Sequence, residues 1–305
     1  MRKKILIFGA NGLVGSSTKR ILAKSEYEVI ASSRSDTDLF NFDQVKNKIK
    51  VSNPDVIVNA AAKVGGILAN NTYRTEFLIE NLKINMNILQ ACIPYPDIKI
   101  INLGSSCIYP LNADNPIKES YIMEGKLEHT NSPYAMAKLT AIELGNSLNL
   151  QYGHQIINLM PTNLYGPNDN FDANNSHVIP GLISRMHQAK LSKSTNFQIW
   201  GSGTPLREFL YVDDLAYAIE FIINKEIDCD LINIGSGEEV SIMDLAKIIK
   251  NIVGFEGVLD FDKTKPDGNP RKLLDSSKIT KMGWKPIFNL ETGIKNTYNW
   301  FLGNN

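Results

Sequence analysis

The sequence predicts an α/β protein, a doubly wound parallel sheet (Rossmann-like) with a smaller mixed α/β substrate lobe. Short apolar runs recur along the chain with helical patterns between them, an alternation that is typical of parallel sheets. These runs are continuous, so both faces of each strand should be buried. A glycine-rich segment at residues 9–15 directly follows the first run.

The predicted elements of the first half alternate in order. We expect strands at 4–8, 29–31, 56–58, 98–103 and 156–160, and helices at 13–24, 42–50, 75–92 and 134–151.

After Pro161 the loops become longer and richer in Asn, Gly and Pro. We expect a strand at 231–234 and helices at 177–189, 213–224, 241–252 and 291–301. We therefore predict a Rossmann domain over 1–165 and a smaller lobe over 166–305. No sharp linker separates them, which leaves room for a strand or helix to cross back to the first domain.

The composition and charge of the chain exclude several classes of function. The 305 residues are 43% hydrophobic and 21% charged, which excludes a disordered chain. A formal net charge of zero argues against a general affinity for nucleic acid or an anionic membrane. Three Cys without a C-x-x-C pair fit a reducing cytoplasm, and no metal site is expected. No apolar run approaches the roughly 18 residues of a membrane span, and the first is too short for a signal peptide.

The glycine-rich segment has the pattern G-x-x-G-x-x-G between a strand and a helix. Glycines let the backbone approach a pyrophosphate, which then lies at the positive end of the helix. The alternative is a chance cluster of glycines. We predict a dinucleotide-binding loop formed by Gly9, Asn11, Gly12, Leu13, Val14 and Gly15.

The second strand ends in Ser32-Ser33-Arg34. NAD-binding enzymes usually place an acidic residue there, to accept hydrogen bonds from the ribose hydroxyls. Neutral hydroxyls and an arginine suit a 2′-phosphate, so we predict NADP(H). Arg34 is otherwise a solvated loop charge, and Asp38 is expected to face the adenine.

Two Tyr–Lys pairs have the spacing Y-x-x-x-K, and chance alone predicts about one. Tyr95 and Lys99 enclose Pro96 and run into a strand, so they cannot share a helix face. Tyr134 and Lys138 follow a helix-start signal. The ammonium of Lys138 is expected to lower the pKa of the phenol, so that Tyr134 can exchange a proton with a carbonyl oxygen.

A hydroxyl at the end of the fourth strand can hold the same carbonyl oxygen. Ser105 is the candidate, and a strand-end cap is the alternative reading.

Several blocks, in order along nearly the whole chain, resemble the GDP-L-fucose synthase family of the extended short-chain dehydrogenase/reductases. They lie at 60–67, 69–73, 104–110, 161–167, 169–171, 175–180, 200–205, 207–209, 265–268 and 270–275. The spacing of the glycine loop is also the short-chain dehydrogenase variant.

The resemblance implies a reaction. That family inverts C3 and C5 of GDP-4-keto-6-deoxy-D-mannose and then reduces C4 with NADPH. Cys107 and His177 match its acid/base pair, and Ser105 and Tyr134 match the groups that polarise the C4 oxygen. Lys138 also holds the nicotinamide ribose. Without the resemblance, Cys107 reads as a small buried hydrophobe and His177 as a capped loop imidazole.

The resemblance further implies cofactor contacts and substrate contacts. The remaining cofactor contacts are Ala61, Ala62, Pro161, Asn163 and Leu164, with Tyr134, Lys138 and His177 again. The substrate contacts are Ser106, Arg185, Trp200, Arg207 and Asp267. For Arg185 and Arg207 the alternative is surface salt bridging.

The chain also departs from the family pattern. Ala10-Asn11 replaces a histidine and a basic residue, which weakens the NADP prediction. Around the tyrosine, Asn131-Ser132-Pro133 lacks the usual acidic middle residue, and His129 replaces a proline. These positions line the approach to the sugar, so the hexose or heptose identity stays open.

Three other functions are alternatives to this reaction. One is a C4 reductase acting on an already epimerised GDP-4-keto-6-deoxy-heptose in surface polysaccharide biosynthesis. A dehydratase is disfavoured, because residues 106–108 offer no carboxylic acid. The last is a regulator that binds NADP without turnover. By resemblance, helices 75–92 and 134–151 are expected to pair into a homodimer interface.

Overall fold

The computed structural model describes residues 2–172, 176–265 and 267–304. Its larger lobe is built on a six-stranded sheet in the order β2-β1-β3-β4-β5-β9, and every pairing in it is parallel. The strands are β1 (Lys3–Phe8), β2 (Tyr27–Ser32), β3 (Val56–Asn59), β4 (Lys99–Leu103), β5 (Gln155–Pro161) and β9 (Leu231–Ile234). The predicted doubly wound sheet is confirmed.

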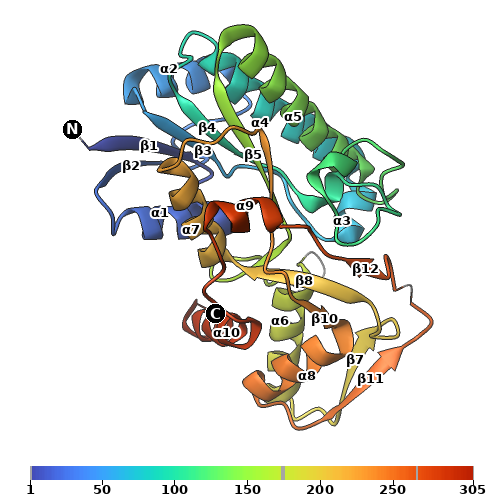
Figure 1. Ribbon diagram of the computed structural model, residues 1–305. Helices are drawn as coiled ribbons and strands as arrows, with labels where there is room; N and C mark the ends of the chain where they lie inside the picture. Colours follow the sequence, from blue (N-terminus) through green and yellow to red (C-terminus); the bar gives the residue numbers. More distant parts are fainter. Residues whose placement is uncertain (1, 173–175, 266, 305) are drawn as a thin grey trace.

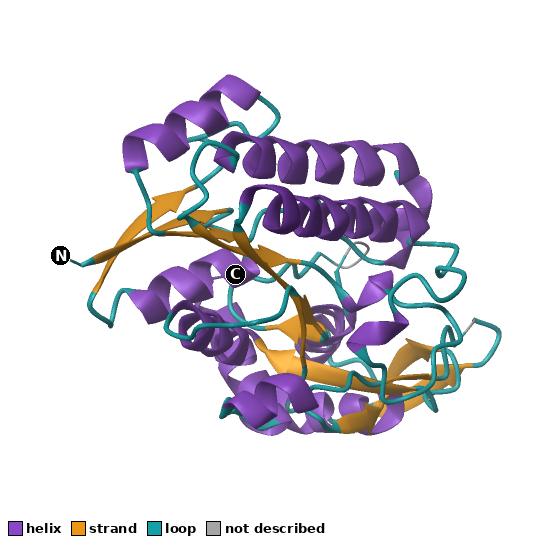
Figure 2. Ribbon diagram, turned by 45° about the horizontal axis from the view of Figure 1, so that its top comes forward, coloured by secondary structure: helices purple, strands orange, loops and turns teal. Residues whose placement is uncertain are grey.

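Helices cover both faces of this sheet (Figures 1 and 2). One face carries α2 (Phe42–Ser52), α4 (Arg74–Cys92) and α5 (Ser132–Tyr152), and the other carries α1 (Leu13–Leu22), α7 (Val212–Ile223) and α9 (Ser277–Met282). Within β1, Ile5 and Ile7 pack toward the α1 and α7 side, whereas Leu6 and Phe8 pack toward α2 and α4. The prediction that continuous apolar runs form strands buried on both faces is therefore confirmed for this sheet.

The smaller lobe has its own core. Strand β8 (Leu206–Tyr211) pairs with β6 (Asn163–Tyr165), β10 (Glu239–Ser241) and β12 (Arg271–Lys272), and β7 (Asn196–Trp200) pairs with β11 (Val258–Asp262). Helices α6 (Val178–Leu191), α8 (Ile242–Val253) and α10 (Leu290–Asn304) pack around them (Figure 1). No helix in the described ranges is long and apolar enough to cross a bilayer.

All eight predicted helices are present, with ends that differ by at most three residues. Two short helices, α3 (Ile67–Thr72) and α9, were not predicted, because six residues are too few to display a clear period. The strands of the smaller lobe were missed for two reasons. Strands β6, β10 and β12 have three residues or fewer, and polar residues interrupt β7, β8 and β11, so none of them is a continuous apolar run.

Segments from the second half of the chain complete the larger lobe. Helix α7 packs on α1, and β9 extends the large sheet by pairing with β5. Helix α9 then adds Ile279 to the same core. The chain thus passes repeatedly between the two lobes.

Glu208, on β8, ties the lobes together. Its side chain is fully buried. One carboxylate oxygen accepts from the backbone N–H of Gly237 at 2.8 Å, and the other accepts from that of Leu274 at 3.1 Å. Its own carbonyl accepts from the Asn163 side chain at 2.9 Å. Burial raises the pKa of Glu208, and the two backbone N–H donors oppose that shift.

Candidate active site

The glycine loop brings the backbone of the first βα turn into very close packing. Gly9 has φ +74°, and a Cβ there would lie 2.8 Å from the backbone of Ala61. A Cβ on Gly15 would lie 2.1 Å from the Gly9 carbonyl oxygen. Only glycine fits at both positions, which leaves the N-terminus of α1 open toward a pyrophosphate. These residues therefore fit a dinucleotide.

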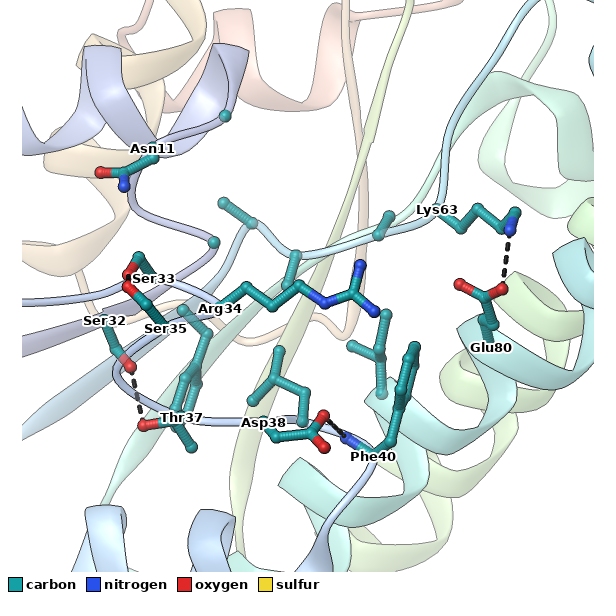
Figure 3. A pocket seen from close by; sticks show the side chains of 18 residues that line it. Asn11, Ser32, Ser33, Arg34, Ser35, Thr37, Asp38, Phe40, Lys63 and Glu80 are labelled. Carbon is teal, nitrogen blue, oxygen red and sulfur yellow. Dashed lines mark hydrogen bonds and ion pairs between the residues drawn. The ribbon is translucent and has the colours of Figure 1, made fainter.

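A cleft of about 530 Å³ opens beside this loop (Figure 3). Seven of the predicted cofactor residues line it, namely Gly9, Asn11, Gly12, Arg34, Asp38, Ala61 and Ala62. The others lie outside it: Leu13, Val14 and Gly15 are in α1, Tyr134 and Lys138 are in α5, Pro161 ends β5, Asn163 and Leu164 begin β6, and His177 precedes α6. Their contacts with a cofactor stay a prediction.

The charges at the end of β2 suit a phosphorylated ribose. The Arg34 side chain is exposed and extends across the cleft, with its guanidinium carbon 5.5 Å from the centre of the Phe40 ring (Figure 3). It forms no ion pair within the described ranges. The Asp38 carboxylate instead accepts from the backbone N–H of Phe40 at 3.0 Å. A free cation beside an engaged carboxylate fits NADP better than NAD.

An ion pair at the far end of the cleft was missed by the sequence analysis. Lys63 Nζ lies 2.6 Å from Glu80 Oε1 (Figure 3). The backbone N–H of Lys63 also donates to Asn81 Oδ1 at 3.0 Å. The sequence feature that could have predicted Lys63 is its position directly after Ala60–Ala62, within the block at 60–67 that resembles the family.

A ladder of buried amides underlies the cleft and was also missed. Asn59 Nδ2 donates to Asn102 Oδ1 at 2.8 Å, and Asn102 Nδ2 donates to Asn158 Oδ1 at 3.0 Å. These residues occupy matching register positions on β3, β4 and β5. Asn59 Oδ1 then accepts from the backbone N–H of Ala61 at 3.3 Å, which links the ladder to the cleft wall. Asparagines inside consecutive apolar runs were the available signal.

Helix α5 positions the tyrosine and the lysine. Its start at Ser132 confirms the predicted helix-start signal. Tyr95 lies after α4 and Lys99 begins β4, so this second Y-x-x-x-K pair does not share a helix face, as expected. Lys138 is 2% exposed and donates from Nζ to the carbonyl oxygen of Leu103 at 2.6 Å. Burial lowers the pKa of Lys138 to about 8.

The prediction that Lys138 lowers the pKa of the phenol is wrong for this structure. Burial raises the pKa of Tyr134 above its ordinary value, proximity to Cys107 raises it further, and a hydrogen bond with Ser105 opposes the shift. The reason is geometric. Lys138 Nζ is directed to Leu103 and lies 5.8 Å from the centre of the Tyr134 ring.

Ser105 and Cys107 lie on the turn that follows β4. Ser105 precedes the 3₁₀ turn η1 (Ser106–Ile108), and its Oγ accepts from the backbone N–H of Cys107 at 3.2 Å. Ser105 therefore also caps the η1 turn at the end of β4, which was the alternative role considered for it. Cys107 is partly exposed, and its Sγ accepts from Asn131 Nδ2 at 3.5 Å. The structure thus brings Ser105, Cys107, Tyr134 and Lys138 together.

His177 comes from the smaller lobe. It directly precedes α6, and part of the residue is open to solvent. The protein that crowds around it desolvates the ring and lowers the pKa of His177. No contact among the described residues joins it to Cys107, so their pairing stays a prediction. Asn175, in the same resembling block, lies outside the described residues.

The predicted substrate residues of the smaller lobe lie on neighbouring segments. Arg185 stacks on Phe197, with its guanidinium carbon 5.1 Å from the ring centre. Asp267 Oδ1 accepts from the backbone N–H of Ser202 at 2.6 Å, and Lys265 Nζ lies 5.8 Å from the centre of the Trp200 ring. These contacts hold the segment after β7 against the segment after β11. Pro266 lies outside the described residues.

The two arginines keep their charges free of salt bridges. Within the described part of the chain, neither Arg185 nor Arg207 forms an ion pair, so the surface salt-bridge reading is not supported. Burial lowers the pKa of both guanidinium groups, and nearby Asp267 opposes the shift at Arg207. Ser106 lies in the η1 turn and is buried. Half-buried, unpaired guanidinium groups are suited to binding a diphosphate.

Known proteins resemble this chain over its whole described length. The model of the NAD dependent epimerase/dehydratase family matches residues 5–235. GDP-L-fucose synthase 1 of Arabidopsis thaliana is 45% identical over 302 residues, which cover 99% of this chain and 94% of that protein. GDP-L-fucose synthase of Escherichia coli (strain K12) is 42% identical over 313 residues, covering 99% and 98%. The structure of MlghC, a GDP-mannoheptose C4 reductase from Campylobacter jejuni with NADP bound, has a TM-score of 0.88 at 33% identity and covers 99% of this chain and 98% of that chain. The chain therefore belongs to the NAD dependent epimerase/dehydratase family.

Proposed function

We propose that this chain is an NADP-dependent enzyme that reduces C4 of a GDP-4-keto-6-deoxy sugar after inverting C3 and C5. The product is GDP-L-fucose or a close analogue. The observation that carries the proposal is the cluster of Ser105, Cys107, Tyr134 and Lys138 beyond the carboxyl end of β4. Similarity to GDP-L-fucose synthases and to a GDP-mannoheptose C4 reductase supports it.

The reduction step uses the tyrosine and its neighbours. When bound, NADPH supplies the hydride that reduces C4. Ser105 and Tyr134 donate hydrogen bonds to the C4 oxygen, which polarises the carbonyl. Tyr134 then protonates that oxygen, since a tyrosine phenol carries its proton at neutral pH. Lys138 holds the nicotinamide ribose.

The epimerisation step uses Cys107 and His177. The 4-keto group acidifies the C–H bonds at C3 and C5, because the electron pair passes into an enolate. Inversion needs a base on one face of the sugar and an acid on the other. We assign these two roles to Cys107 and His177. Arg185, Trp200, Arg207 and Asp267 hold the GDP portion, with the guanidinium groups on the diphosphate.

A C4 reductase that acts on an already epimerised GDP-4-keto-6-deoxy-heptose is the second candidate. The departures at His129 and Ser132 favour it, because both residues lie in the segment that directly precedes Tyr134. Similarity to the GDP-mannoheptose C4 reductase also favours it. The regulator without turnover is not supported, because such a protein has no need for the clustered Ser105, Tyr134 and Lys138.

Deuterium exchange followed by NMR tests the proposal. GDP-4-keto-6-deoxy-D-mannose is incubated with the protein in D₂O, first alone and then with NADPH. We expect deuterium at C3 and C5 in the first stage, because epimerisation needs no hydride, and GDP-L-fucose in the second. NADPH oxidation without deuterium uptake would remove the epimerase half and leave the C4 reductase. A reaction with a heptose substrate alone would favour the second candidate.

We also propose that the enzyme is a homodimer, paired through the outer faces of α4 and α5. Each helix exposes a stripe at three- and four-residue spacing that includes large apolar side chains. The stripes are Ile79, Lys83 and Met86 on α4, and Met136, Thr140, Glu143, Ser147 and Leu150 on α5. Leu150 is 89% exposed. A second copy would cover these faces and place cationic and acidic positions of the stripes near each other.

Met86→Glu is expected to convert the dimer to a monomer, because it introduces a charge at the centre of the proposed interface. Sedimentation velocity at micromolar concentration measures the mass. Val51→Glu is the matched control, since Val51 is 75% exposed on α2, away from both stripes. A parent protein of monomer mass would rule out this interface.

The three free cysteines fit a reducing compartment, and we place the enzyme in the cytoplasm.

A further inference from the structure

Asn131 occupies a helix N-cap position but does not cap the helix. It immediately precedes α5, and its side chain makes no capping hydrogen bond to the first turn. Asparagine is common at this position because its side-chain oxygen usually accepts from a backbone N–H of that turn. The helix therefore does not account for the asparagine here.

The amide of Asn131 is instead directed at Cys107. Its Nδ2 donates to Cys107 Sγ at 3.5 Å. Its Oδ1 is buried and has no hydrogen-bond partner among the described residues. Buried polar atoms are nearly always paired, so an unpartnered oxygen on this side chain requires an explanation.

The loop that carries Asn131 is held from two sides. The Glu128 carboxylate accepts from the backbone N–H of Thr130 at 3.0 Å and from that of Asn131 at 3.2 Å. Arg74, on α4, donates to the carbonyl oxygen of His129 at 2.8 Å and to Ser132 Oγ at 3.1 Å. The backbone of Asn131 is therefore fixed, and only the side-chain torsions are left to adjust.

We propose that Asn131 is a positioning residue that serves both protonation states of Cys107. This inference rests on the proposed function, in which Cys107 is one member of the acid/base pair, so that its sulfur passes between thiolate and thiol while His177 exchanges the other proton on the opposite face of the sugar. An amide donates N–H to the thiolate, and a half-turn about its terminal torsion presents Oδ1 to accept from the thiol S–H. That torsion is soft, and the free Oδ1 offers no competing bond to break.

Three substitutions separate the two halves of this role. Asn131→Ala removes both functions, and it removes no capping bond. Asn131→Asp keeps the size of the side chain and the acceptor, but it loses the donor and places a carboxylate beside the sulfur. Asn131→Ser keeps a hydroxyl that can donate or accept. Each variant is compared with the parent for the rate at which iodoacetamide alkylates Cys107, followed by mass spectrometry.

We expect alkylation of Cys107 to slow by about tenfold in Asn131→Ala and by more in Asn131→Asp, because the thiolate is the reactive form. Asn131→Ser should stay within about threefold of the parent. Cys229 is the control within each sample, since it is partly exposed and lies outside the site. Unchanged Cys107 alkylation in both Ala and Asp variants would overturn the proposal.

Deuterium exchange adds a second readout that separates this inference from the proposed function. Uptake at C3 and C5 should fall in the Ala and Asp variants and recover in Ser, whereas C4 reduction of an already epimerised substrate should change by less than about threefold. A matching loss of C4 reduction would point to a structural role and overturn the proposal. If the parent takes up no deuterium while alkylation still follows the expected order, the epimerase function fails and the Asn131–Cys107 coupling is supported.

Discussion

Tyr134→Phe is expected to lower the rate of C4 reduction by about 10²–10⁴-fold, the range by which a positioned acid or base accelerates a reaction. The phenylalanine keeps the ring that lies 6.4 Å from that of Phe77, so the packing of α5 on α4 should persist. What is lost is the hydroxyl that hydrogen-bonds with Ser105 and that we propose as the proton donor to the C4 oxygen. Single-turnover oxidation of NADPH at saturating substrate measures this step directly.

Tyr109→Phe is the matched control for this substitution. Tyr109 is buried, and its hydroxyl donates to Asn233 Oδ1 at 2.6 Å, on the side of the turn that faces β9. Its removal should lower stability and leave the turnover rate within about threefold of the parent. An active Tyr134→Phe enzyme would mean that another group, such as Ser105, protonates the oxygen.

Glu208→Ala is expected to lower the free energy of unfolding by about 2–5 kcal/mol, because it removes a fully buried side chain and leaves one buried and one partly buried backbone N–H group without acceptors. These are the N–H groups of Gly237, in the loop after β9, and of Leu274, after β12. Both lie where the chain passes between the lobes. Urea unfolding followed by circular dichroism measures the change.

The control is Glu239→Ala on the neighbouring strand. Glu239 pairs in register with Glu208, but its carboxylate forms an ion pair at the surface with Arg271 at 2.6 Å. Loss of such a pair should cost about 1 kcal/mol or less. Equal shifts for the two variants would show that Glu208 does not tie the lobes together.

The large sheet was predictable because its information is local. Each strand is a continuous apolar run, and each helix has its own period, so β1 to β5 and the intervening helices followed from short windows of sequence. The pairing of β9 with β5 depends on contacts between residues more than 70 positions apart, such as Asn158 and Leu231, and no short window contains it. In the smaller lobe, β12 has only two residues, and the six-residue β8 contains Arg207 and Glu208, so neither forms an apolar run.

The candidate site divides in the same way. Tyr134 and Lys138 are one helical turn apart, so their proximity follows from helix geometry. The amide ladder and the pair of Lys63 with Glu80 join residues on different elements and were missed. The pKa of Tyr134 was predicted in the wrong direction, because burial of the phenol has the largest influence on it and Lys138 Nζ donates to the carbonyl oxygen of Leu103 instead. Spacing along a helix determines neither.

The repeated passage of the chain between its lobes has a consequence for biosynthesis. A ribosome that has released residues up to the end of β5 has supplied five strands of the large sheet, but the edge of β5 is still uncovered. Its neighbour β9 emerges only after α6, β7, β8 and α7 have been made. An open edge of this kind invites pairing with other chains, so the nascent protein depends on its own later segments, or on a chaperone, to protect it. Because the chain crosses between the lobes several times, dividing it at any one position would not give two fragments that each contain one whole lobe.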